Sequence, residues 1–196
     1  GFRAVMPDAA RHGARYDGDA GTRLDRFWEI LKQNIDELPQ LEAALRDENL
    51  IAGSRFAVAG ASMGGMTALG AMARYPQIHS VACMMGSGYF MQLSHSLFPP
   101  RLPDSPDRQA KFAARMAPLA EYDPCNRLTA LADRPLLLWH GEADEVVPWA
   151  ETERLERALR DNGLDQHLTS LSEKGIGHKI TPSALTALVS FFRHQL

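Results

Sequence analysis

The pentapeptide Gly-Ala-Ser-Met-Gly at 60–64 constrains the fold of this chain more than any other stretch. It follows the apolar run 55–59 and precedes a run of small residues with helical character over 65–73. A Gly-x-Ser-x-Gly pattern between a strand and a helix is typical of the nucleophile elbow, a sharp turn that holds the serine in a strained backbone conformation. The glycines carry no Cβ, so strand and helix can approach closely. We therefore expect Ser62 at a strand-to-helix turn.

Apolar patterning along the rest of the chain predicts strands that alternate with helices. The expected strands cover 2–6, 55–59, 78–85, 136–139 and 167–171, and the expected helices cover 22–38, 65–73, 110–119, 149–162 and the stretch from 181 onward. Pro39 is expected to kink the first helix or to begin a second one. Such alternation predicts a parallel sheet with helices on both faces, within a single α/β domain over 1–196.

One segment, 87–132, departs from this alternation. It loses clear periodicity and contains several prolines, and only 110–119 has an amphipathic helical pattern. A long irregular segment inside a compact domain is usually functional or a disordered insertion. We interpret it as a small lid inserted into the domain.

Composition narrows the class of partner. The chain has 21 Lys and Arg against 24 Asp and Glu, a net charge of −3, with both signs interspersed. No basic stripe or RNA-binding motif is present, which argues against nucleic acid, and the apolar runs are too short for a membrane span. Cys83 and Cys125 lack metal-ligand spacing. We expect two reduced thiols in a cytoplasmic protein, with a disulfide as the alternative.

Polar residues follow three of the expected strands, where α/β proteins collect their functional groups. Ser62 follows the first of these strands, Asp144 follows 136–139, and His178 follows the last one. Glu142 and Glu145 flank Asp144. The order Ser, Asp, His along the chain is that of the α/β-hydrolases.

Each of these residues has a chemical reason to be there. A serine hydroxyl is a weak nucleophile, and the His178 imidazole would take its proton during attack. A carboxylate would fix the imidazole tautomer, and Asp144 is preferred over Glu142 and Glu145 because its reach is shorter. The backbone N–H of Met63 would face the oxyanion.

Less specific interpretations stand beside these. Ser62 could be a small residue in a tight turn, Asp144 a helix-capping acid, and His178 one of several structural histidines. We expect His140 to be a strand-end residue that supports the acid loop. Apolar residues after 86–88 could line an acyl pocket or form the lid's own small core, and they are Tyr89, Phe90, Leu93, Leu97 and Phe98.

Five motifs together carry a family resemblance. They are Met-Pro-Asp-Ala-Ala-Arg-His-Gly at 6–13, the pentapeptide 60–64, Met-Met-Gly-Ser-Gly-Tyr-Phe at 84–90, Trp-His-Gly-Glu-Ala-Asp at 139–144 and Gly-His-Lys-Ile-Thr-Pro at 177–182. The chain resembles the small bacterial YjfP-type carboxylesterases of the α/β-hydrolase superfamily, on its dienelactone-hydrolase and prolyl-oligopeptidase side. The resemblance implies hydrolysis of small, short-acyl esters by Ser62, Asp144 and His178, without metal or organic cofactor.

Acyl or peptidyl transfer, or peptide hydrolysis, on the same triad is one alternative function. The other is an inactive, truncated interaction module. Members of the family begin with several tens of residues more, which carry three strands and a second oxyanion N–H. We therefore expect this chain to be a partial α/β-hydrolase domain in which strand 2–6 lacks a partner beside 55–59.

Overall fold

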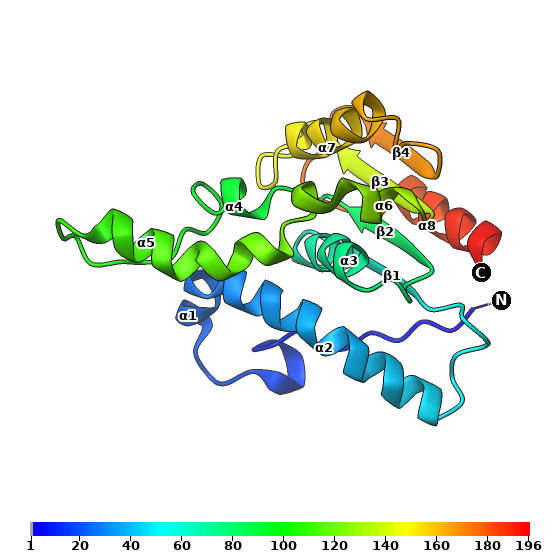
Figure 1. Cartoon of the computed structure of the whole chain (residues 1–196), viewed down its shortest axis with the longest axis horizontal. Coiled ribbons are helices and arrows are strands. Elements are labelled where there is room, and N and C mark those ends of the chain that lie inside the picture. Colours follow the sequence, from blue (N-terminus) through cyan, green and yellow to red (C-terminus); the bar gives the residue numbers. More distant parts are fainter. Residues whose placement is uncertain (1) are drawn as a thin grey trace.

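The computed structural model describes residues 2–196, and a four-stranded sheet forms its centre (Figure 1). The strands are β1 (Ala57–Ala61), β2 (Ser80–Met84), β3 (Leu136–Gly141) and β4 (Leu168–Glu173), in the spatial order β1-β2-β3-β4. All three pairings are parallel, with Ala59 opposite Ala82 and Cys83 opposite Leu138. The carboxyl ends of the strands therefore meet at one edge, and the predicted α/β class is confirmed.

Helices cover both faces of this sheet. They are α1 (Ala20–Asp25), α2 (Phe27–Asp47), α3 (Met63–Arg74), α4 (Phe90–Leu93), α5 (Arg108–Met116), α6 (Leu128–Ala132), α7 (Trp149–Asp161) and α8 (Pro182–Gln195), with 3-10 turns η1 (Gly13–Arg15), η2 (Ala117–Tyr122) and η3 (Pro124–Arg127). Within residues 2–196, none of them combines the length and apolarity that a bilayer crossing needs.

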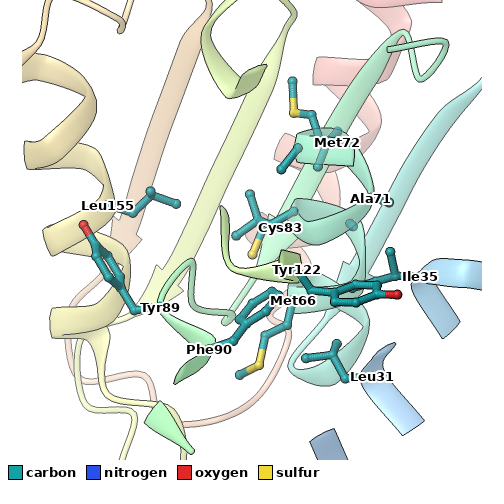
Figure 2. Close-up of a cluster of buried hydrophobic side chains, with 14 of the residues drawn as sticks. Leu31, Ile35, Met66, Ala71, Met72, Cys83, Tyr89, Phe90, Tyr122 and Leu155 are labelled. Atoms are coloured by element: carbon teal, nitrogen blue, oxygen red, sulfur yellow. The ribbon is translucent and has the colours of Figure 1, made fainter. Parts of the chain in front are cut away.

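Two hydrophobic clusters hold the layers together, because successive strand residues point to opposite faces. Val81 and Cys83 of β2 face the larger cluster, which α2, α3 and α7 complete. Ala82 and Met84 face the smaller one, where Phe191 of α8 packs against the sheet. Figure 2 shows part of the larger cluster, with side chains of α2 and α3 next to β2.

The first helical region differs from its prediction. Pro39 lies inside α2 and does not begin a second helix. The helical region is interrupted instead at Arg26, between α1 and α2. The break occurs where Arg26 adopts φ −104° and ψ 17°, outside the helical region. Asp19 caps α1 by accepting hydrogen bonds from the N–H groups of Gly21 and Thr22, so the helix begins before Thr22.

The predicted strand 2–6 is wrong. The segment is extended coil without strand pairing, and Phe2, Val5 and Met6 are exposed by 44%, 46% and 91%. A strand is stabilised by its neighbour, and a cleft of about 780 Å³ separates this segment from the free side of β1. The segment lacks a partner beside β1, as expected. The expected strand itself does not form, because an apolar pattern alone does not make a strand.

The segment 87–132 contains α4, α5, η2, η3 and α6, and α5 projects from the body of the molecule (Figure 1). Side chains tie this segment to α1 and α2 at several points. Trp28 donates its indole N–H to the Leu97 carbonyl at 3.1 Å, and Arg115 pairs with Asp25 at 3.2 Å and Glu29 at 3.0 Å. These contacts define how the segment is anchored, while its role as a lid stays a prediction.

Candidate active site

Ser62 occupies the sharp turn between β1 and α3. Its φ of 55° and ψ of −120° lie in a region that residues with a side chain rarely adopt. The turn is held from two directions, because Ser62 donates its N–H to the Met84 carbonyl at 2.8 Å and accepts at its own carbonyl from Met66 N–H at 3.0 Å. The hydroxyl is thereby presented at the carboxyl edge of the sheet.

His178 lies on the loop between β4 and α8, and its side chain is 21% exposed. Its Nε2 is 2.9 Å from Ser62 Oγ, and its Nδ1 is 2.6 Å from Asp144 Oδ2. The three residues that the strand-end argument singled out are therefore brought together from three different strands.

Asp144 lies in the loop between β3 and α7, and its carboxylate is fully buried. Oδ1 accepts hydrogen bonds from the N–H groups of Val146 and Val147 at 2.9 and 3.0 Å. Burial alone would raise the pKa of Asp144, but the hydrogen bonds from His178 and from these two amides outweigh it and lower the pKa. The carboxylate is therefore ionised at neutral pH.

Proton positions along this chain of groups follow from the ionised carboxylate. A carboxylate can only accept, so His178 donates from Nδ1 to Asp144. The neutral ring then carries a lone pair on Nε2, which can accept the hydroxyl proton of Ser62. This is the tautomer that a general base next to a serine requires.

The loops that carry Asp144 and His178 pack against each other. Ala143 donates its N–H to the Ile176 carbonyl at 2.9 Å. A Cβ at Gly141 would stand 2.3 Å from the same carbonyl oxygen, so the close approach of the two loops requires glycine at this position. Backbone packing thus sets the spacing of the acid and the base.

The other candidate acids and histidines have different surroundings. Glu142 accepts a hydrogen bond from Ser172 at 2.8 Å, and Glu145 is exposed. Four other histidines bond to backbone carbonyls or pack on an aromatic ring: His12 bonds to Ala10, His79 to Gln195 and His194 to Ser190, and His95 packs on the ring of Phe112.

His140, by contrast, lies inside the site and has no exposed surface. Its Nε2 is 3.1 Å from Asp144 Oδ2 and 2.9 Å from the Val147 carbonyl oxygen, and its Nδ1 is 2.7 Å from Thr152 Oγ1. Sequence reasoning placed His140 beside the acid loop but missed its bond to the carboxylate itself and missed Thr152. The sequence did contain a signal for this bond: a histidine near the end of a buried strand, four residues before the acid.

Met63 is the first residue of α3, directly after Ser62. The N–H groups of a first helical turn have no carbonyl partner within the helix. The N–H of Met63 is therefore available beside the serine hydroxyl, and its assignment to an oxyanion site stays a prediction.

The predicted substrate-pocket residues lie in and around α4, mostly out of contact with solvent. Tyr89, Phe90 and Leu93 are 8%, 0% and 5% exposed and belong to the larger hydrophobic cluster, where Figure 2 shows Phe90 beside Met66. Phe98 is half-buried, with its ring centroid 5.0 Å from that of Phe27. Their assignment to an acyl pocket stays a prediction.

Solved structures place this arrangement in a class. The crystal structure of TT1662 from Thermus thermophilus is similar, with a TM-score of 0.69 and 27% identity over 96% of this chain and 74% of that chain. A puromycin-hydrolyzing peptidase of Mycobacterium tuberculosis matches with a TM-score of 0.68 and 22% identity, over 83% of this chain and 25% of that chain. This is a likeness of fold alone. The parallel sheet and the serine turn, together with these neighbours, define an α/β-hydrolase fold.

Sequence comparison makes the assignment more specific. The profile of the prolyl oligopeptidase family matches residues 30–196. Esterase YjfP of Escherichia coli (strain K12) is 52% identical over 196 residues, which are 100% of this chain and 79% of that protein. The chain belongs to the prolyl oligopeptidase family, and the resemblance to YjfP-type proteins is confirmed.

Proposed function

We propose that this chain is a serine-dependent carboxylic ester hydrolase that works through an acyl-enzyme on Ser62. The observation that carries the proposal is the continuous chain of hydrogen bonds from Ser62 Oγ through His178 to Asp144, at 2.9 and 2.6 Å. The family assignment and the esterase name of the Escherichia coli relative support it.

The first half of the proposed reaction forms the acyl-enzyme. Ser62 Oγ attacks the ester carbonyl carbon while its proton moves to His178 Nε2, and Asp144 stabilises the resulting imidazolium. The oxyanion develops beside the N–H of Met63. When the tetrahedral intermediate collapses, the bond to the alcohol oxygen breaks and His178 gives its proton to the departing alkoxide.

The second half repeats these steps with water. His178 takes a proton from water, whose oxygen attacks the acyl carbon, and returns that proton to Ser62 Oγ as the acid product leaves. The strained turn at Ser62 fixes the hydroxyl before substrate arrives, so little reorganisation is left for the reaction itself.

We propose small, short-acyl esters as substrates. The resemblance to the YjfP-type carboxylesterases, which implies such substrates, supports this choice. A panel of nitrophenyl esters of increasing acyl length tests it. Rates that fall steadily beyond about four to six acyl carbons are expected; rates that rise with length contradict the short-acyl assignment.

The nucleophile is tested by covalent labelling. A fluorophosphonate probe should label the chain, and Ser62→Ala should abolish both labelling and ester hydrolysis. Ser87→Ala is the matched control, since Ser87 lies buried in the loop after β2 and donates its hydroxyl to Glu151 rather than to a histidine. Labelling that persists in Ser62→Ala assigns the nucleophile to another residue.

Peptide hydrolysis is the second candidate, because the family that contains this chain is described as an oligopeptidase family. The two functions differ in leaving group, since an amine must be protonated as the bond breaks and an activated phenolate need not be. Matched ester and amide substrates with the same acyl group compare them directly. A higher kcat/KM for the amide would favour the peptidase.

A further inference from the structure

We propose that His140 is a positioning residue of the triad, whose Nε2–H holds the Asp144 carboxylate in the orientation that receives the Nδ1–H of His178. The inference rests on the proposed function and deepens it. Its basis is that two imidazoles converge on one oxygen, with Asp144 Oδ2 at 2.6 Å from His178 Nδ1 and at 3.1 Å from His140 Nε2.

The geometry fixes the tautomer of His140. Both atoms close to Nε2, Asp144 Oδ2 and the Val147 carbonyl oxygen, can only accept, so the ring proton lies on Nε2 and is shared between them. Nδ1 then accepts the hydroxyl proton of Thr152 at 2.7 Å. The Thr152 hydroxyl could also donate to the Gly86 carbonyl, but this oxygen is 3.3 Å away and is the more distant of the two acceptors.

Burial keeps His140 in this state. It is the largest influence on the pKa of His140 and lowers it, against the opposing effects of the Val147 carbonyl and the Asp144 carboxylate, while the nearby His178 lowers it further. A neutral ring donates from one nitrogen and accepts at the other. A charged ring would instead donate from both, and the Thr152 hydroxyl would have to turn to Gly86.

The hydrogen bond from His140 restrains a rotation of the Asp144 carboxylate that the backbone hydrogen bonds leave free. Val146 and Val147 fix Oδ1 of Asp144 through their N–H groups, but these bonds leave the second oxygen free to swing about the first. His140 restrains Oδ2, and the Val147 carbonyl and Thr152 in turn hold the His140 ring. The two oxygens of the carboxylate are thus held by different elements, and His178 meets a preorganised acceptor.

Two substitutions separate positioning from packing. In His140→Gln the side-chain amide nitrogen reaches the place of Nε2 and can donate to Asp144, whereas in His140→Asn the amide is too short and reaches only the place of Nδ1. We expect His140→Asn to lower kcat roughly 10- to 100-fold with KM changed by less than about twofold, the range for one charge-assisted hydrogen bond. His140→Gln should stay within about threefold of the wild-type kcat.

A double-mutant cycle then asks whether the effect passes through the carboxylate. In an Asp144→Asn background the bond is already lost, so His140→Asn should cost less than about threefold more. If His140→Asn lowers kcat as much in the Asp144→Asn background as in the wild type, the proposal is overturned. A wild-type kcat in His140→Asn would also overturn it, as would equal losses of kcat in His140→Asn and His140→Gln. Thermal unfolding of each variant identifies losses that come from stability alone.

A second readout needs no turnover. The proton between His178 Nδ1 and Asp144 Oδ2 lies in a short, charge-assisted hydrogen bond and should give a far-downfield proton NMR resonance. We expect the resonance to persist in His140→Gln and to shift or vanish in His140→Asn; an unchanged resonance in both variants rejects the positioning role. If the wild-type chain hydrolyses no ester, the proposed function fails while this measurement still decides the role of His140.

Discussion

Gly60 and Gly64 meet at the base of the serine turn, where a Cβ placed on Gly60 would stand 2.2 Å from the carbonyl carbon of Gly64. No side chain fits at such a distance, and backbone atoms on the other side cannot move aside cheaply. The missing Cβ of Gly60 therefore allows α3 to begin this close to β1, and the tight turn between them holds Ser62 in its unusual backbone conformation.

Gly60→Ala should destabilise the fold through this contact. We expect the free energy of unfolding to fall by about 2–3 kcal/mol or more, as for overpacking against backbone. Gly64→Ala is the matched control, because a Cβ there meets no atom within 4 Å and alanine favours the helix by about 0.5–1 kcal/mol. Urea unfolding of both variants checks the prediction, and equal losses would mean that the turn tolerates a side chain at Gly60.

Asp144→Asn should remove the acceptor that sets the His178 tautomer. An amide in this position can donate to Nδ1, which leaves the proton on Nε2 and the base facing Ser62 without a lone pair. We expect kcat to fall by about four orders of magnitude with little change in KM. Glu145→Gln, a neighbouring exposed acid, is the control and should change kcat by less than about twofold. A small effect of Asp144→Asn would assign the acid to another residue.

His140 gives the stability of the fold a pH dependence. Burial lowers the pKa of His140 below the value of about 6.5 that an unperturbed imidazole has. Above about pH 6.5 the folded and unfolded states both hold the ring neutral; as pH falls below it, the unfolded chain binds a proton that the folded chain does not, and folding loses stability until the lower folded-state pKa is passed.

The non-titrating variant His140→Gln isolates this contribution. The wild-type stability minus the variant stability should decline as the pH is lowered from about 7 to 5, by at most about 1.4 kcal/mol per pH unit. Chemical denaturation at a series of pH values measures the difference. A difference that stays constant over this range would show that His140 titrates alike in both states.

The sequence predicted the parts of this fold that local physics determines. The strand ends at Ser62, Asp144 and His178 could be found because a buried strand shows as a continuous apolar run and because parallel strands bring their carboxyl ends to one edge. The start of α8 could be predicted for the same reason, because neighbouring residues determine it. Thr181 accepts a hydrogen bond from the Ala184 N–H, and Pro182 occupies the first helical position.

The two predictions that failed concern contacts that no local sequence pattern records. The apolar segment 2–6 has the composition of a strand, but strand formation needs a neighbour to accept its hydrogen bonds, and composition does not supply one. The bond between His140 and Asp144 was missed for a related reason. Its distance depends on how the loop 141–147 folds back over the end of β3, which no periodicity records.

Phe90 offers a last test, between packing and substrate binding. The residue has no exposed surface, its ring centroid lies 6.2 Å from that of Trp28, and its backbone N–H donates to the buried Asp123 carboxylate at 2.8 Å. Phe90→Ala should therefore leave a cavity and lower the free energy of unfolding by about 3–5 kcal/mol. Leu185→Ala on α8, where the side chain is 53% exposed, is the control and should cost less than about 1 kcal/mol.

The ester panel completes this comparison. If Phe90 is a core residue, the alanine variant loses stability while its preference among acyl lengths stays that of the wild type at temperatures where both are folded. If Phe90 bounds the acyl site, the cavity admits longer chains, and one extra methylene accommodated there is worth about 1–3 kcal/mol in kcat/KM. A shift of the preferred acyl length without a large loss of stability would therefore place Phe90 at the substrate and contradict the packing role that its burial indicates.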